Sequence, residues 1–132
     1  MIGALMLDIA GTELTQEDIE LLRTPQVGGM ILFSRNIKSP QQVRALTDHM
    51  RRIRPDILIA VDQEGGRVQR LKQGFTLLPA MGRLGELYLT EPEQAVDLAE
   101  QCGWLMATEV LAVGIDFSFA PVLDLNDVSD VI

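Results

Sequence analysis

The 132-residue sequence has little of several residue types on which particular classes of protein depend. Cys102 is the only cysteine, so no disulfide can form within the chain, and a reducing compartment is indicated. His49 is the only histidine, which excludes zinc sites built on paired histidines. Neither a G-x-G-x-x-G segment after a strand nor a P-loop is present. We therefore expect no cofactor and no histidine-based metal site.

Basic residues are also scarce, since 11 Lys and Arg stand against 19 Asp and Glu, for a net charge of −8. Nucleic acids and anionic membrane surfaces bind basic faces, so this balance argues against both kinds of partner. No apolar run reaches the roughly 18 residues that a membrane-spanning helix needs. Residues 1–11 lack the basic start of a secretory signal. These absences predict a cytoplasmic protein.

The clearest pattern that the sequence does contain is the stretch from Ile57 to Arg70. Its first five residues, Ile-Leu-Ile-Ala-Val, are all apolar, which is typical of a strand buried on both faces in an α/β protein. The polar residues 62–64 then fall at the carboxyl end of that strand. Because α/β folds place their ligands at this end of the strands, we expect a polar ligand to bind there.

Four charged side chains are expected to meet at this rim. The pair Gly65-Gly66 lets the backbone turn sharply without a clash at Cβ. Arg67 and Arg70 follow the turn, within reach of the carboxylates of Asp62 and Glu64. From position alone, we expect Asp62 to bind the ligand and Glu64 to pair with one of the arginines. Arg70 can clamp a substrate, lock Asp62 or do both, because a guanidinium has several donors.

Strand and helix patterns alternate along the chain. Apolar runs predict strands at residues 2–11, 28–33, 57–61 and 115–125. Periodic apolar residues predict helices at 15–25, 39–55 and 90–114, and residues 71–89 read as a loop with a short helix near 83–88. This alternation predicts parallel strands with right-handed crossovers. Four such strands would leave apolar edges, which indicates a piece of a larger barrel.

The three longer helices are each predicted to start at a hydroxyl side chain that caps free backbone N–H groups. These caps are Thr15, Ser39 and Thr90. The last helix also carries an apolar stripe at helical spacing, which we expect to face the core. Its members are Ala95, Leu98, Ala99, Cys102, Leu105, Met106, Val110 and Val113.

Other polar residues at predicted strand ends are expected to be turn or capping residues rather than ligands. They are Asp8, Asp116, Asp124 and Asn126. A divalent metal held by Asp62 and Glu64 is an alternative, although two carboxylates without a third ligand are a weak signal.

Four segments carry a resemblance to a known family. They are residues 7–11, 29–36, 61–70 and 119–124. In this order they resemble the amino-terminal part of bacterial β-N-acetylhexosaminidases of glycoside hydrolase family 3. The Asp-Gln-Glu-Gly-Gly-Arg-Val-Gln-Arg block at 62–70 is the most specific part. Because the resemblance covers the whole chain, residues 1–132 are expected to be the amino-terminal part of a single glycoside hydrolase barrel domain.

The resemblance implies an α/β fold, a TIM-type (β/α) barrel of which this chain supplies roughly the first half of the strands. It also implies an enzyme of peptidoglycan recycling, a monomer when complete, that removes terminal non-reducing β-linked N-acetylglucosamine from anhydro-muropeptide fragments. In that family the aspartate and the last arginine of the block contact the sugar. These substrate-binding roles map onto Asp62 and Arg70.

The same resemblance implies no catalytic residue in this chain. The family retains anomeric configuration through a glycosyl-enzyme intermediate, and its nucleophile and acid/base residue lie beyond the position of Ile132. The chain alone is therefore expected to be inactive. Two alternatives stay open: a metal-dependent barrel enzyme that uses Asp62 and Glu64, and a non-catalytic sugar-binding module.

Overall fold

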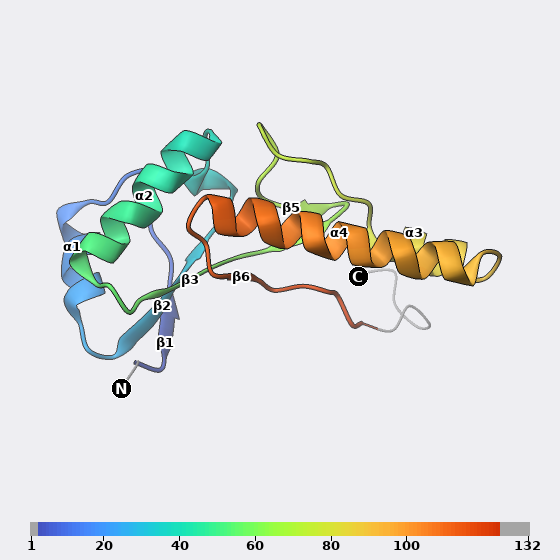
Figure 1. Cartoon of the computed structure of the whole chain (residues 1–132). Coiled ribbons are helices and arrows are strands. Elements are labelled where there is room, and N and C mark those ends of the chain that lie inside the picture. The colour runs from blue at the N-terminus through green and yellow to red at the C-terminus, as the bar shows by residue number, and fades with distance from the viewer. Residues whose placement is uncertain (1–2, 125–132) are drawn as a thin grey trace.

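The computed structural model describes residues 3–124 and contains a sheet of four parallel strands (Figure 1). The strands are β1 (Leu5–Leu7), β2 (Val27–Leu32), β3 (Leu58–Val61) and β6 (Phe117–Ser118), and they lie side by side in chain order. The predicted parallel sheet is thus confirmed. Strands that follow one another around the sheet without a reversal are the arrangement found in (β/α) barrels.

Helices connect the successive strands. They are α1 (Gln16–Arg23), α2 (Pro40–Ile53), α3 (Met81–Tyr88) and α4 (Pro92–Ala112), with a short 3₁₀ turn η1 (Ser34–Asn36) after β2. Each helix lies within a range predicted to be helical or overlaps it closely. Among the described residues, no helix is both long and apolar enough to cross a membrane.

The core lies on the face of the sheet that α1, α2 and α4 cover. Met30 and Leu32 of β2 and Ile59 and Val61 of β3 are fully buried there, because every second side chain of a strand points to the same face. They pack against Leu22, Val43, Leu46, Met50 and Val110 of the helices.

The prediction that residues 57–61 are buried on both faces is wrong at Leu58. Its side chain is 38% exposed, whereas Ile59 and Ala60 are completely buried. Leu58 lies on the face opposite Ile59, and Ala60 on that same face is buried, so the exposure is confined to the first residue of β3.

Both outer strands are shorter than predicted. β1 spans three residues and β6 two, against expected ranges of 2–11 and 115–125, of which 2 and 125 lie outside the described residues. Each of these strands pairs with one described neighbour only. β6 pairs with β3, which ends at Val61, so ladder bonds run out after Phe119 N donates to Val61 O.

Two of the three predicted helix caps are confirmed. The Thr15 hydroxyl accepts from Asp18 N and the Asp18 carboxylate accepts from Thr15 N, which completes a capping box on α1. The Ser39 hydroxyl accepts from Gln42 N on α2. The prediction for Thr90 is wrong, because Glu91 occupies the cap position and the Thr90 hydroxyl instead donates back to Leu87 O.

The apolar stripe predicted on α4 is mostly not buried. Only Ala95 and Val110 of this 21-residue helix are buried, together with Val113 directly after it, and Leu98 is 37% exposed. Cys102, predicted to be in the core, is only half-buried. The four-stranded sheet lies near the carboxyl-terminal end of α4, and the amino-terminal part of the helix lies along α3 instead (Figure 1).

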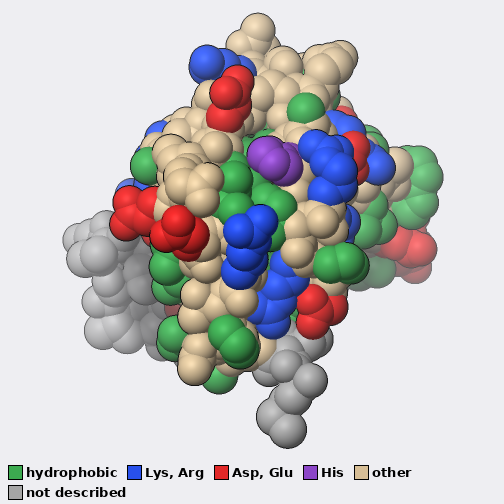
Figure 2. Space-filling model, turned by 90° about the vertical axis from the view of Figure 1, so that its left-hand side faces the viewer, with side chains coloured by type: hydrophobic (Ala, Val, Ile, Leu, Met, Phe, Trp, Pro, Cys, Tyr) green, Lys and Arg blue, Asp and Glu red, His purple; other side chains and the backbone are tan. Residues whose placement is uncertain are grey.

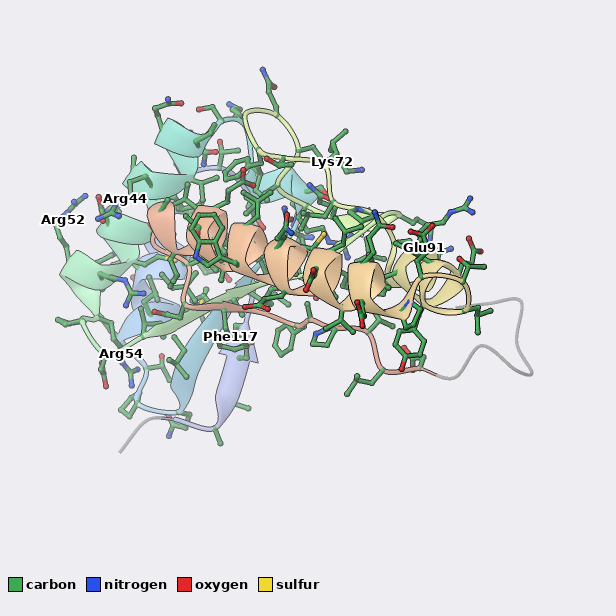
Figure 3. All side chains as sticks on the ribbon, turned by 45° about the vertical axis from the view of Figure 1, so that its right-hand side comes forward. Arg44, Arg52, Arg54, Lys72, Glu91 and Phe117 are labelled. Atoms are coloured by element: carbon green, nitrogen blue, oxygen red, sulfur yellow. The ribbon has the colours of Figure 1, made fainter. Side chains whose placement is uncertain are left out.

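The basic residues of α2 tie the helix to its neighbours. Figure 3 shows Arg44 and Arg52 on α2 and Arg54 just after its last turn, and Figure 2 shows basic side chains gathered beside the histidine. Arg51 donates to Ile57 O, Gly114 O and the Asp116 carboxylate. Arg54 donates to the carbonyls of Leu22 and Thr24. Arg51 therefore fastens the loops before β3 and β6, and Arg54 fastens the loop after α1.

Candidate functional site

The carboxyl ends of β1, β2 and β3 lie at one edge of the sheet, because the strands are parallel and neighbouring. Asp8 directly follows β1, Phe33 and Arg35 follow β2, and Asp62 follows β3. Three loops that are distant in the sequence thus bring carboxylates, guanidiniums and an aromatic ring together at the edge where α/β folds bind ligands.

Asp62 and Arg70 form an ion pair at this edge. The Nη2 atom of Arg70 donates to the Oδ2 atom of Asp62 at 2.9 Å. The two side chains are partly shielded, with 20% of Asp62 and 28% of Arg70 exposed. Partial exposure leaves room for a ligand, while partial burial strengthens the electrostatic attraction relative to bulk water. Of the two roles predicted for Arg70, locking Asp62 is confirmed.

The predicted pairing of Glu64 with an arginine is wrong. Among residues 3–124, neither Glu64 nor Arg67 takes part in an ion pair. The reason is a hairpin that the sequence analysis did not foresee, formed by β4 (Gln63–Gly65) and β5 (Val68–Gln69). Gln63 pairs with Gln69 in this antiparallel ladder, so the flanking residues Asp62 and Arg70 lie opposite each other.

The glycine pair makes the tight turn of this hairpin, as predicted. Gly65 has a φ of +92° and Gly66 a φ of +59°, conformations that residues with a Cβ adopt at a cost. The surroundings are equally restrictive, because a Cβ on Gly65 would lie 2.3 Å from the Pro79 carbonyl oxygen. The turn therefore requires glycine for conformation and for space.

A second ion pair and an aromatic ring adjoin the first pair. Asp8 pairs with Arg35, and the guanidinium of Arg35 lies 4.9 Å from the centre of the Phe33 ring. The guanidinium of Arg70 lies 5.8 Å from the same ring. Both distances suit cation–π attraction. No role was predicted for Phe33 or Arg35, although they follow an apolar run just as Asp62 does.

Asn36 holds the loops that carry this second pair. Its side chain is fully buried, and its Nδ2 atom donates to the carbonyls of Ile9 and Gly11 at 2.9 and 2.8 Å. Its Oδ1 atom accepts from Phe33 N at 2.8 Å. The loop after β1 is thereby fastened to the loop after β2, which fixes Asp8 relative to Phe33.

The remaining candidates lie elsewhere. Asp116 directly precedes β6 and accepts from Ile59 N at 2.7 Å, a capping role as predicted. Asp124 is exposed, and Asn126 lies outside the described residues. The described part of the chain contains no group of three His, Cys, Asp or Glu side chains that could hold a metal ion.

The sequence profile of the glycosyl hydrolase family 3 N-terminal domain matches residues 3–132. The chain belongs to glycosyl hydrolase family 3. The family 3 N-terminal domain is a TIM-type barrel, and the parallel sheet with its connecting helices is a part of that barrel, as predicted.

Relatives and solved structures agree with this membership of family 3. The chain is 63% identical over 126 residues to a beta-hexosaminidase from Pseudomonas aeruginosa, covering 96% of the chain and 36% of that relative. It matches NagZ from Neisseria gonorrhoeae, solved in complex with N-trifluoroacetyl-D-glucosamine, at 47% identity and a TM-score of 0.91 over 94% of the chain and 37% of NagZ. A family 3 beta-N-acetylglucosaminidase from Paenibacillus aligns at 33% identity and a TM-score of 0.78, over 92% of the chain and 23% of that structure.

The chain thus spans little more than a third of the curated family 3 relatives it matches. The part of this chain that matches the family 3 N-terminal domain holds the Asp62–Arg70 pair.

Proposed function

We propose that this chain supplies one wall of the sugar pocket of an enzyme that hydrolyses terminal non-reducing β-linked N-acetylglucosamine. One observation carries the proposal: the Asp62–Arg70 ion pair stands at the carboxyl end of β3 in a chain of family 3. The beta-hexosaminidase relative and the NagZ complex with an N-acylglucosamine support the choice of sugar.

The chemistry of the pair suits a polyol ligand. A carboxylate has about four lone-pair positions and a guanidinium five N–H donors, and the single bond between Asp62 and Arg70 uses one of each. The Nε atom of Arg70 is buried and has no partner among the described residues, so the donors open to sugar hydroxyls are those of its two Nη atoms. The remaining lone pairs of Asp62 can accept from sugar hydroxyls. Because the pair and the Phe33 ring hold one another in place, little side-chain entropy is lost when the sugar binds.

We further propose that residues 1–132 are the amino-terminal part of one barrel domain whose catalytic groups lie in the rest of the enzyme. A retaining glycosidase needs two carboxyl-type groups flanking the glycosidic bond, one as nucleophile and one as acid/base. Asp62 is engaged by Arg70, so binding rather than nucleophilic attack is its role in this proposal.

The proposed substrates are anhydro-muropeptide fragments of peptidoglycan, cleaved in the cytoplasm by a monomeric enzyme. The scarcity of cysteine supports a reducing compartment. To test the substrate, kcat/KM is measured for a purified N-acetylglucosaminyl anhydro-muropeptide and for chitobiose. We expect the higher value for the anhydro-muropeptide. Equal values for both compounds would contradict the peptidoglycan assignment.

The first prediction concerns Asp62. We consider a completed chain, in which this sequence replaces the corresponding segment of the Pseudomonas aeruginosa relative. It should hydrolyse 4-nitrophenyl N-acetyl-β-D-glucosaminide. Asp62→Ala should raise KM and lower kcat together, with kcat/KM falling about a hundredfold. The reason is that the carboxylate would no longer accept the two charge-assisted hydrogen bonds proposed from sugar hydroxyls.

Glu64→Gln is the matched control for this measurement, since Glu64 lies on the same rim without an ion pair among the described residues. Its kinetics should equal those of the unsubstituted completed chain. Unchanged kinetics for Asp62→Ala would remove Asp62 from the pocket. Loss of activity with a chelator would favour the metal-dependent alternative that uses Asp62 and Glu64.

A further inference from the structure

The side chain of Gln63 lies behind the Asp62–Arg70 pair and is 1% exposed. Its Oε1 atom accepts from the backbone N–H of Arg70 at 3.1 Å and from that of Leu71 at 2.9 Å. Its Nε2 atom donates to Leu71 O at 3.0 Å. A single buried amide therefore holds the backbone from which the Arg70 side chain extends.

The backbone of Gln63 is itself fastened to the sheet. Gln63 N donates to the Ser118 hydroxyl at 2.9 Å, and that hydroxyl donates to Gln63 O at 3.1 Å. Ser118 belongs to β6, which pairs with β3 through Val61. Gln63 is thus bonded to β6 through its backbone and to the backbone of Arg70 through its side chain. Asp62, the residue before Gln63, and Arg70 are therefore both positioned relative to the sheet.

This arrangement addresses a physical problem of the ion pair. Arginine has a long, freely rotating side chain, and a partly exposed pair contributes about 1 kcal/mol or less by itself. Fixing the backbone of Arg70 narrows the positions that its guanidinium can reach. Glutamine suits this place because one side chain supplies both the acceptor for two N–H groups and the donor for a carbonyl.

Gln69 offers an internal comparison. It is also buried, at 2% exposed, and lies opposite Gln63 in the hairpin. Its Nε2 atom donates to the carbonyls of Leu71 and Thr76, and its Oε1 atom accepts from Leu78 N. Gln69 therefore makes as many hydrogen bonds as Gln63 to the same loop, but none to Arg70.

We propose that Gln63 is a positioning residue for Arg70: it sets the sugar affinity of the pocket through the arginine, without touching the sugar. The inference rests on the proposed function, since Arg70 is taken as a sugar-binding group.

The test uses Gln63→Met in the completed chain, with Gln69→Met as its matched control. Methionine keeps the length and burial of the side chain but removes the hydrogen bonds. We expect Gln63→Met to raise KM for 4-nitrophenyl N-acetyl-β-D-glucosaminide about tenfold, because the N–H groups at Arg70 and Leu71 lose their acceptor. Gln69→Met should change KM less than twofold, even where both variants lower Tm to a similar extent.

A double-mutant cycle separates positioning from general stabilisation. In an Arg70→Ala background, Gln63→Met should produce no further rise in KM, because the group through which it acts is absent. The same tenfold rise in that background, or an equal rise for Gln69→Met, would overturn the inference.

A milder substitution covers the case in which Gln63→Met does not fold. Gln63→Asn keeps the amide but shortens the side chain by one methylene, which weakens the hydrogen bonds to Arg70 and Leu71, so KM should rise about threefold, and only while Arg70 is present. A rise that persists with Arg70→Ala would count against positioning. An inactive unsubstituted completed chain would instead overturn the proposed function, and this inference with it.

Discussion

At the scale of single residues, the ring of Phe33 contacts the arginines of both ion pairs at the carboxyl edge of the sheet. It lies under the guanidiniums of both Arg35 and Arg70, whose partners Asp8 and Asp62 follow β1 and β3, the strands on either side of β2. Each arginine therefore interacts with a carboxylate and with an aromatic face at once. A lysine ammonium, a compact and strongly hydrated charge, cannot reproduce this combination of planar donors and stacking.

The second prediction follows from this geometry. Arg70→Lys in the completed chain should lower kcat/KM about tenfold despite the conserved charge, because the planar donors and the contact with Phe33 are lost. Arg67→Lys is the control, since Arg67 is exposed and forms no ion pair with described residues. Steady-state kinetics measure both variants. Equal kinetics for Arg70→Lys and the unsubstituted protein would show that charge alone suffices.

The third prediction concerns the hairpin turn. Gly65→Ala should lower the free energy of unfolding of the completed chain by about 1–3 kcal/mol, since alanine is strained at positive φ and its Cβ would meet the Pro79 carbonyl. Gly11→Ala is the control, because nothing lies within 4 Å of a Cβ built there. Urea denaturation provides the comparison. A Gly65→Ala variant as stable as Gly11→Ala would contradict the described turn.

At the scale of elements, buried amides fix the loops at the carboxyl edge of the sheet. Asn36 joins the loops after β1 and β2, while Gln63 and Gln69 fasten the loop after β5. Each amide meets backbone donors and acceptors that are not part of a strand or helix. Loops without regular structure thereby acquire a defined shape beside the ion pairs.

The fourth prediction compares two helix starts that look alike in the sequence. Ser39→Ala should lower the free energy of unfolding by about 1 kcal/mol, because the Ser39 hydroxyl caps Gln42 N on α2. Thr90→Ala should have an effect of about 0.5 kcal/mol or less, because Thr90 does not cap α4. Urea denaturation of the completed chain measures both. Equal losses would indicate that Thr90 does cap α4.

At the scale of the whole molecule, α4 and β6 leave an apolar hollow between them. Its volume is about 450 Å³, and Met106, Val110, Phe117 and Pro121 are among the residues that line it. Phe117 lies on β6 beneath the helix in Figure 3. Leu111, which also lines the hollow, is 58% exposed. Trp104, elsewhere on α4, is 69% exposed. Exposed apolar surface beside an apolar hollow marks an interaction site or promotes aggregation.

The fifth prediction concerns the 132-residue chain by itself. It should show no hydrolysis of 4-nitrophenyl N-acetyl-β-D-glucosaminide, and it should bind the dye ANS at its exposed apolar surface. The completed chain should hydrolyse the substrate and bind little ANS. Activity in the isolated chain would contradict the assignment of the catalytic groups to the rest of the enzyme. Binding of N-acetylglucosamine by an isolated chain that unfolds cooperatively would favour the sugar-binding module.

The sequence by itself determined the order of the four sheet strands and of the helices between them, the parallel sheet and the position of Asp62 at a strand end. These features depend on local patterns: apolar runs, helical spacing, and turn or capping residues. The prediction of a cap at Thr90 was wrong because the helix begins one residue later, so that Glu91 occupies the N-cap position. The sequence pattern does not distinguish these two neighbouring positions.

Only the tertiary structure decided which charges meet. The hairpin register places Arg70 opposite Asp62 and leaves Glu64 without an ion partner among residues 3–124. Phe33 joins the site because β2 lies beside β3, a neighbour relation between segments about 30 positions apart in the sequence. The burial of Gln63 depends on the same packing. Side-chain type and spacing specify which groups are available, whereas strand pairing and register specify which of them come within bonding distance.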